Sequence, residues 1–224
     1  MKCFLFIYLF FLLSCKENKQ EVKTDLPAFW NDIQAFKKQG SVSFPPANAI
    51  LFIGSSSFTL WKDVQNYFPG YTIINRGFGG SALSDQIRYA NDIIFPYTPK
   101  QIVIYCGEND LASSDTVTTA IVFTRFKQLF QMIRGKFTDL PVAFISIKPS
   151  PSRRHLFSKM REANQLIKDF LTDQKNTAFI DVHQKMWNDT GEPVPEIFLD
   201  DSLHMNAKGY DIWKKEIEPH LLKD

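Results

Sequence analysis

The sequence carries little net charge and few cysteines. Its 224 residues include 26 Lys and Arg against 24 Asp and Glu, a net charge of +2, with no long basic run. Without such a run the chain lacks a general means of binding phosphate backbones, so nucleic acid is not an expected partner. The 44% hydrophobic content suits one globular core and excludes a disordered chain, collagen and coiled coil.

The long apolar run near the N-terminus is too short to cross a membrane. Cys3 to Leu13 spans eleven residues, whereas a membrane helix needs about 20. With Lys2 before the run and Ser14 after it, the pattern predicts a signal peptide over residues 1–14. Leu12-Leu13-Ser14-Cys15 resembles the lipobox of bacterial lipoproteins, which implies cleavage before Cys15 and lipid attachment to its sulfur. The alternative is an anchor helix retained in the mature chain.

A polar segment follows, and residues 15–25 are predicted to form a solvated tether before a domain over residues 26–224. A frayed terminus without a role has the same composition. The lipobox implies an exported bacterial lipoprotein of the cell envelope, attached to a membrane through Cys15. Because Cys3 would leave with the signal peptide, Cys106 would be the single free thiol, and no internal disulfide is expected.

Five short apolar runs alternate with helical patterns. The runs are continuous, which is typical of parallel strands buried on both faces; they are Ala49–Ile53, Tyr71–Ile74, Gln101–Tyr105, Val142–Ile147 and Ala178–Val182. Apolar residues at helical spacing predict helices over Leu26–Lys38, Leu83–Ile94, Val117–Ile133 and Leu156–Leu171 and after Asn206. This order predicts a three-layer α/β/α sandwich with a five-stranded parallel sheet, whose ligands bind beyond the carboxyl ends of the strands.

Serine and glycine segments follow the first two predicted strands. Gly54-Ser55-Ser56-Ser57 can hold a serine at the sheet edge near backbone N–H groups, although serines also cap helices. Asn75-Arg76-Gly77-Phe78-Gly79-Gly80-Ser81 can point N–H groups into open space, or can be a plain glycine-rich turn. Neither segment has the spacing of a dinucleotide fingerprint, a P-loop or an α/β-hydrolase elbow.

Two later segments supply an amide, an acid and an imidazole. Asn109, in Gly107-Glu108-Asn109-Asp110, can donate to an oxyanion beside a serine or can simply form a turn. Asp201 precedes His204 by three residues, so it can orient one ring nitrogen while the other faces a serine; Asp200 is one residue out of register. The other histidines lack such an acid and are expected at the surface or in packing: His155, His183 and His220.

The four segments together resemble the SGNH hydrolases, the GDSL-like esterase/lipase family, over about Ile50 to Tyr210. Ser56 matches the family's nucleophile, although Gly54-Ser55-Ser56 replaces the usual Gly-Asp-Ser. Gly80 matches the oxyanion glycine and Asn109 the asparagine of G-x-N-D. Asp201 and His204 match the last motif, D-x-x-H.

The resemblance implies a flavodoxin-like fold and ester hydrolysis by Ser56, His204 and Asp201, with an oxyanion hole of Ser56, Gly80 and Asn109. No cofactor is expected, and no H-E-x-x-H or Cys/His cluster indicates a metal. The expected substrate is a short-chain acyl ester, small or polysaccharide-linked, such as an acetylated carbohydrate. The alternatives are a lysophospholipase or thioesterase with the same triad, and a non-catalytic surface lipoprotein. Apolar residues near the motifs can line an acyl pocket or belong to the core: Phe58, Leu60, Trp61, Phe78 and Leu111.

We expect Cys15→Ala to release the protein from membranes, because the substitution removes the sulfur that the lipid would modify. Fractionation of bacterial cells that express the two forms, followed by mass measurement of the N-terminal peptide, checks this. Membrane association that does not change in the variant would contradict lipidation at Cys15.

Overall fold

The computed structural model describes residues 26–224. The predicted signal peptide, the lipidation site Cys15 and the tether over residues 15–25 lie outside these described residues. Within residues 26–224, no helix is both long enough and apolar enough to cross a membrane.

Five parallel strands form one sheet, as the apolar runs predict. They are β1 (Ile50–Gly54), β2 (Ile73–Gly77), β3 (Gln101–Tyr105), β4 (Val142–Ile145) and β5 (Thr177–Ile180), in the order β2-β1-β3-β4-β5. Gly54 at the end of β1 pairs with Gly77 of β2 and with Tyr105 of β3. Because these three strands end at the same level, the segments that follow them meet at one edge of the sheet.

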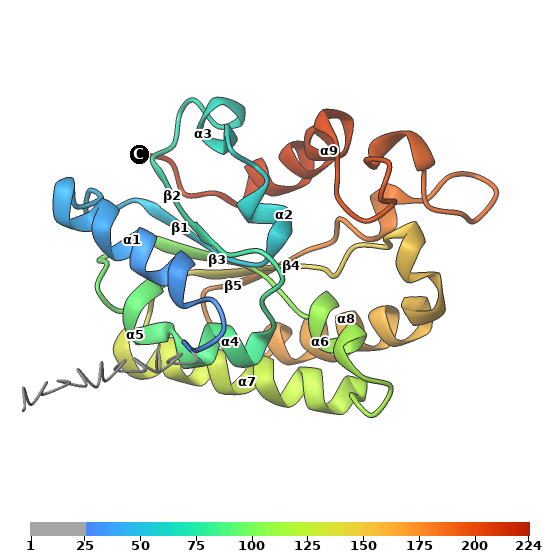
Figure 1. Cartoon of the computed structure of the whole chain (residues 1–224), viewed down its shortest axis with the longest axis horizontal. Coiled ribbons are helices and arrows are strands. Elements are labelled where there is room, and N and C mark those ends of the chain that lie inside the picture. Colours follow the sequence, from blue (N-terminus) through green and yellow to red (C-terminus); the bar gives the residue numbers. More distant parts are fainter. Residues whose placement is uncertain (1–25) are drawn as a thin grey trace, which may run out of the picture.

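Helices cover both faces of the sheet, so the domain has the three predicted layers (Figure 1). One layer contains α1 (Trp30–Val42), α4 (Leu83–Arg88), α5 (Ala90–Ile93), α6 (Glu108–Ser113), α7 (Thr119–Lys136) and α8 (Phe157–Thr172). The other contains α2 (Ser56–Thr59), α3 (Val64–Tyr67) and α9 (Ala207–Ile217). Residues 26–224 also contain four short 3-10 helices: η1 (Pro151–Leu156), η2 (Gln184–Met186), η3 (Pro195–Ile197) and η4 (Glu218–His220).

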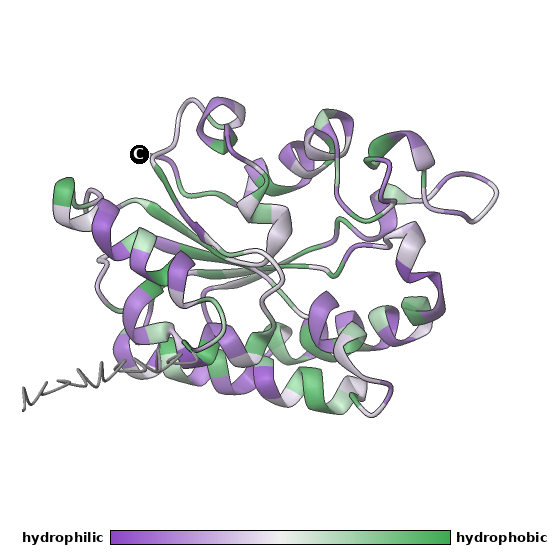
Figure 2. Ribbon diagram, in the orientation of Figure 1, coloured by the Kyte–Doolittle hydropathy of each residue, from purple (hydrophilic) through white to green (hydrophobic). Residues whose placement is uncertain are grey.

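Two hydrophobic cores lie on the two faces of the sheet, because successive strand residues point to opposite sides. Ile53 packs into the core beneath α4, α7 and α8, whereas its neighbour Phe52 packs into the core beneath α2 and α9. The second core is rich in aromatic rings; Trp213 of α9 lies edge-on to Tyr105, with ring centroids 4.7 Å apart. Figure 2 shows the apolar strands at the centre and polar residues along the outer helices.

Two helices differ most from their predicted boundaries, whereas the ends of the other predicted helices and strands shift by three residues or fewer. The helix predicted over residues 83–94 is divided into α4 and α5, because Tyr89 leaves the helical dihedral angles with φ −100° and ψ 12°. Its hydroxyl donates to the carbonyl of Ala28 at 2.6 Å. The first helix begins at Trp30 rather than at Leu26, since Phe29 has a φ of 64°, which a right-handed helix does not allow.

The end of β1 accommodates only a glycine. Gly54 has a φ of 152°, and a Cβ atom there would overlap the carbonyl oxygen of Tyr105. The overlapping atoms belong to the backbone of the paired strand β3. The two strands therefore cannot move apart without breaking the hydrogen bonds between them. Gly54 therefore fixes how closely β1 and β3 approach just before the first motif.

We expect Gly54→Ala to lower the free energy of unfolding by at least about 2 kcal/mol, since the backbone conformation and the contact both resist a side chain. Chemical denaturation monitored by circular dichroism measures the change. Gly135→Ala, at an exposed position of α7 with no atom within 4 Å of the added Cβ, is the control and should stabilise by up to about 1 kcal/mol. Equal effects of the two substitutions would show that Gly54 is not constrained.

Candidate active site

Ser56 begins the helix α2 directly after β1. Ser55 before it is extended, and its N–H donates to the carbonyl of Tyr105 at 3.2 Å, so the chain leaves the sheet edge and turns at Ser56. The N–H of Ser56 lies in the first turn of α2 and has no acceptor among residues 26–224. The hydroxyl and the backbone N–H of Ser56 are thus both available at this edge of the sheet.

The carbonyl oxygen of Gly54 ties the loop after β2 to the end of β1. It accepts hydrogen bonds from Phe78 N at 3.0 Å and from Gln86 Nε2 at 3.2 Å. Ser81 Oγ lies 3.2 Å from the same oxygen and donates to the carbonyl of Phe78 at 2.8 Å. Ser81 is fully buried, and its hydroxyl accepts from Gln86 Nε2 at 2.9 Å. These bonds fix the loop on both sides of Gly80.

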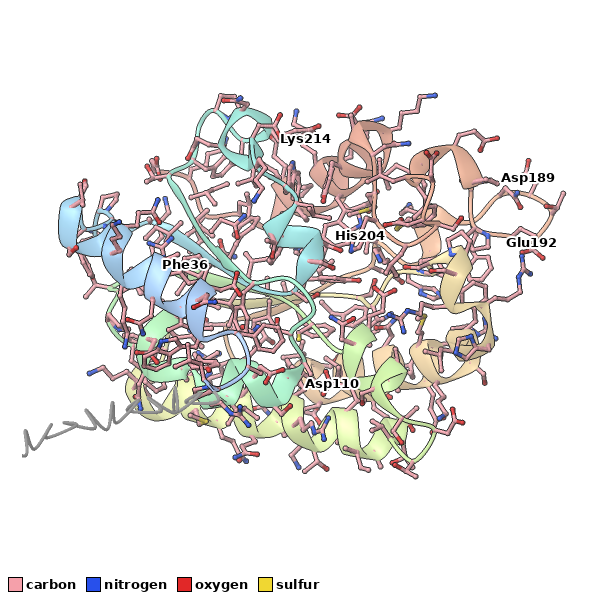
Figure 3. All side chains as sticks on the ribbon, in the orientation of Figure 1. Phe36, Asp110, Asp189, Glu192, His204 and Lys214 are labelled. Atoms are coloured by element: carbon pink, nitrogen blue, oxygen red, sulfur yellow. The ribbon has the colours of Figure 1, made fainter. Side chains whose placement is uncertain are left out.

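Helix α6 brings Asn109 to the same place. Its Nδ2 donates to the carbonyl of Ser81 at 3.1 Å, which uses one of the two amide hydrogens and leaves the other. The next residue, Asp110, lies on the side of α4 and α7 (Figure 3) and accepts from Leu83 N at 2.8 Å and from Arg125 at 2.7 Å. Burial raises the pKa of Asp110, and these bonds oppose that rise. Asp110 is an anchor for α6 rather than part of the pocket.

Ser56, His204 and Asp201 form a continuous line of hydrogen bonds. His204 Nε2 lies 3.0 Å from Ser56 Oγ, and His204 Nδ1 lies 2.6 Å from Asp201 Oδ2. The other carboxylate oxygen of Asp201 accepts from the N–H groups of Leu203 and His204, each at 2.9 Å. His204 lies beside α2, across a chain separation of 148 residues from Ser56 (Figure 3).

Asp201 is ionised at neutral pH. Partial burial raises its pKa, but hydrogen bonds from the backbone and ring of His204 and from the Leu203 N–H outweigh that effect and lower the pKa to about 2. An anionic Asp201 holds the proton of His204 on Nδ1, which leaves Nε2 as the basic nitrogen that faces Ser56.

These groups border one pocket of about 380 Å³. It is lined by Ser56, Thr59, Leu60, Gly79, Gly80, Asn109, Arg153, Leu203 and His204. Gly80 has a φ of 83°, and its N–H has no acceptor in the described part of the chain. The pocket therefore offers three donors, namely the N–H groups of Ser56 and Gly80 and the second amide hydrogen of Asn109.

The structure brings the five site residues named from the motifs to one place, with Asp201 behind His204 and the other four in the pocket wall. Of the five apolar residues considered for an acyl pocket, only Leu60 lines it, with 42% of its surface exposed. The other four are buried in the cores: Phe58, Trp61, Phe78 and Leu111. Thr59, Gly79 and Leu203 adjoin motif residues, whereas no motif marks Arg153.

The remaining candidate groups lie away from the pocket wall. His155 and His220 are exposed, and His183 is buried with its Nδ1 2.8 Å from the carbonyl of Ile147. Cys106 is buried behind Ser81, and burial, with the charge of Asp110, raises its pKa well above the usual value. Across residues 26–224, no three His, Cys, Asp or Glu side chains gather closely enough to hold a metal ion.

Residues 54–212 match the GDSL-like Lipase/Acylhydrolase family. The chain belongs to this family. It is an acyl ester hydrolase with the fold that the motif resemblance implies. A comparison with curated proteins gave no match.

Solved structures share the fold of this GDSL-like hydrolase. A protein from Streptococcus pneumonia described as a platelet activating factor aligns with a TM-score of 0.75 and 19% identity, over 86% of this chain and 92% of that chain. A GDSL-like lipase from Bacteroides thetaiotaomicron aligns with a TM-score of 0.69 and 19% identity, over 84% of this chain and 95% of that chain. An acetylxylan esterase from Geobacillus stearothermophilus aligns with a TM-score of 0.61 and 13% identity, over 80% of this chain and 96% of that chain.

The hydrolase has a buried ion pair next to its pocket. Lys148 Nζ lies 2.7 Å from Glu108 Oε2, with only 1% and 6% of the two side chains exposed. Ser150 Oγ donates to Glu108 Oε1 at 2.6 Å, and the Tyr105 hydroxyl donates to Oε2 at 2.9 Å. Ser150 Oγ also lies 3.4 Å from the carbonyl of Leu203. The glutamate at the variable position of G-x-N-D thus joins α6, the segment after β4 and the loop of His204.

We expect Lys148→Met to lower the free energy of unfolding by about 3–5 kcal/mol, because the Glu108 carboxylate would stay buried without its counter-charge. Replacing both partners, in Glu108→Leu/Lys148→Met, should recover at least half of the loss. Denaturant titrations of the single and double variants measure the coupling. A double variant less stable than Lys148→Met would contradict this interpretation. Lys37→Met is the control, since its ion pair with Asp92 is partly exposed and should cost at most about 1 kcal/mol.

Proposed function

We propose that the hydrolase is a serine esterase that cleaves short-chain acyl esters with Ser56, His204 and Asp201. The observation that carries this proposal is the hydrogen-bonded line from Asp201 to Ser56, which ends at the pocket. A lipoprotein that only binds a ligand has no need of an acid, a base and a nucleophile in register, so the line argues against the non-catalytic alternative.

In the first step His204 Nε2 takes the hydroxyl proton of Ser56 while Oγ forms a bond to the carbonyl carbon of the ester. The carbonyl oxygen becomes an oxyanion that accepts from the N–H groups of Ser56 and Gly80 and from the amide of Asn109. Each such donor typically contributes about 10²–10³ in kcat. The ester C–O bond then breaks, and the alcohol leaves with the proton that His204 held.

In the second step water attacks the acyl group on Ser56 and gives its proton to His204. The bond between the acyl carbon and Oγ breaks, Oγ recovers a proton from His204, and the carboxylic acid leaves. The net change is one ester and one water converted to one acid and one alcohol. Asp201 keeps its negative charge throughout and stabilises the imidazolium in both steps.

The lining of the pocket favours a short acyl group. Leu60 and Leu203 are its only large apolar lining residues within residues 26–224, and the larger apolar residues near the motifs are buried in the cores. A lysophospholipase or long-chain thioesterase needs an extended apolar groove for its acyl chain. The structural likeness to an acetylxylan esterase agrees with an acetylated carbohydrate as substrate.

We also propose that the enzyme is a lipoprotein of the bacterial cell envelope. Support comes from Leu12-Leu13-Ser14-Cys15 and the apolar run before it. Attachment to a membrane through Cys15 would give the pocket access to polymers outside the cytoplasm, for which esterified polysaccharides are suitable substrates.

We expect Ser56→Ala to lower the kcat for p-nitrophenyl esters by at least about 10⁴-fold, while the melting temperature changes by only a few degrees. Rates with acyl groups of two, four, eight and twelve carbons should fall with chain length. Ser55→Ala is the matched control, since Ser55 holds its place through its backbone N–H. Equal loss in the two variants would show that the nucleophile is not Ser56, and faster cleavage of the twelve-carbon ester would favour the lipid-directed alternative.

A further inference from the structure

Arg153 lines the pocket although no motif includes it. It is partly buried and shares the pocket wall with Ser56, Asn109 and His204. Among the lining residues in the described part of the chain, Arg153 alone carries a permanent charge. A guanidinium is charged at every physiological pH, so the pocket has a fixed positive side chain within reach of its ligand.

The backbone around Arg153 is held against the loop of His204. Ser152 N donates to the carbonyl of Ser202 at 3.0 Å, and Arg153 N donates to that of Ser150 at 2.8 Å. The side chain of Ser150 is fixed in turn by the buried ion pair of Lys148 and Glu108. These contacts give the start of the Arg153 side chain a defined position beside the pocket.

No carboxylate in the described part of the chain neutralises the charge of Arg153. Arg154 pairs with Glu192 at the outer edge of the molecule (Figure 3), and Arg125 pairs with Asp110. Within residues 26–224, Arg153 has no carboxylate at ion-pair distance and donates no side-chain hydrogen bond. Guanidinium groups bind carboxylates through two parallel hydrogen bonds, which makes an anionic ligand the expected partner.

The position of Arg153 indicates which part of the substrate carries the anion. Arg153 is tied to the Ser202–His204 loop, and His204 is the group that returns a proton to the leaving alcohol. A single guanidinium in an otherwise uncharged pocket wall matches one negative charge. We propose that Arg153 binds a carboxylate on the alcohol portion of the ester, so that the enzyme prefers acyl esters of acidic alcohols. This inference rests on the proposed esterase function at Ser56.

A pair of aryl acetates that differ in one charge tests the proposal. 4-Acetoxybenzoate carries a carboxylate on its leaving group, whereas its methyl ester does not. With the full chain, Arg153→Gln should lower kcat/KM for 4-acetoxybenzoate at least about tenfold more than for the methyl ester, chiefly through KM. Arg153→Lys should lie between the wild type and Arg153→Gln, and Arg154→Gln should change neither substrate.

The outcomes separate this proposal from the esterase function. Ser56-dependent removal of the acetyl group from methyl 4-acetoxybenzoate tests the esterase function alone. If Arg153→Gln lowers kcat/KM equally for both compounds, or for neither, the proposed carboxylate site is wrong while the esterase function stands. If neither compound is cleaved, calorimetric binding of 4-acetoxybenzoate to the Ser56→Ala variant still tests the carboxylate site. Absence of binding, or equal binding to the Ser56→Ala/Arg153→Gln double variant, would overturn the proposal.

Discussion

The carbonyl oxygen of Gly54 is the point on which the arrangement of the pocket depends. Phe78 N and Gln86 Nε2 donate to it, and Ser81 Oγ lies 3.2 Å away. The carbonyl of Ser81 in turn accepts a hydrogen bond from the side chain of Asn109. The nucleophile segment, the glycine loop and the amide of α6 therefore share one chain of hydrogen bonds. This chain requires that β1, β2 and β3 end at the same level, which the parallel register ensures.

Charge is used in two different ways around the pocket. The buried charges of Glu108 and Lys148 neutralise each other, and the pair joins three segments, so its role is to keep them in register. Arg153, by contrast, is held by its backbone, and its guanidinium has no partner among residues 26–224. A charge that the fold has already neutralised contributes to structure, whereas one left unpaired in a pocket is available to a ligand.

The sequence predicts much of this fold because its strands are buried on both faces and read as continuous apolar runs. The proximity of the motif residues is equally predictable, since Ser56 and Asn109 follow strands that end together. The interruption at Tyr89 lies inside a segment with helical spacing, and the Tyr89 hydroxyl donates to the carbonyl of Ala28, 61 residues away in the chain, a contact that local spacing does not predict. The place of Arg153 depends likewise on a contact between Ser152 and Ser202, which no local pattern encodes.

Cys106 lies next to the pocket and can serve as a probe of local opening. Its thiol is almost fully buried behind Ser81, and burial holds its pKa high, so it is neither accessible nor ionised in this structure. A thiol reagent can reach it only if the packing around it opens. The rate at which Cys106 is modified under native conditions therefore measures how often the core next to the pocket opens, and the measurement needs no substrate.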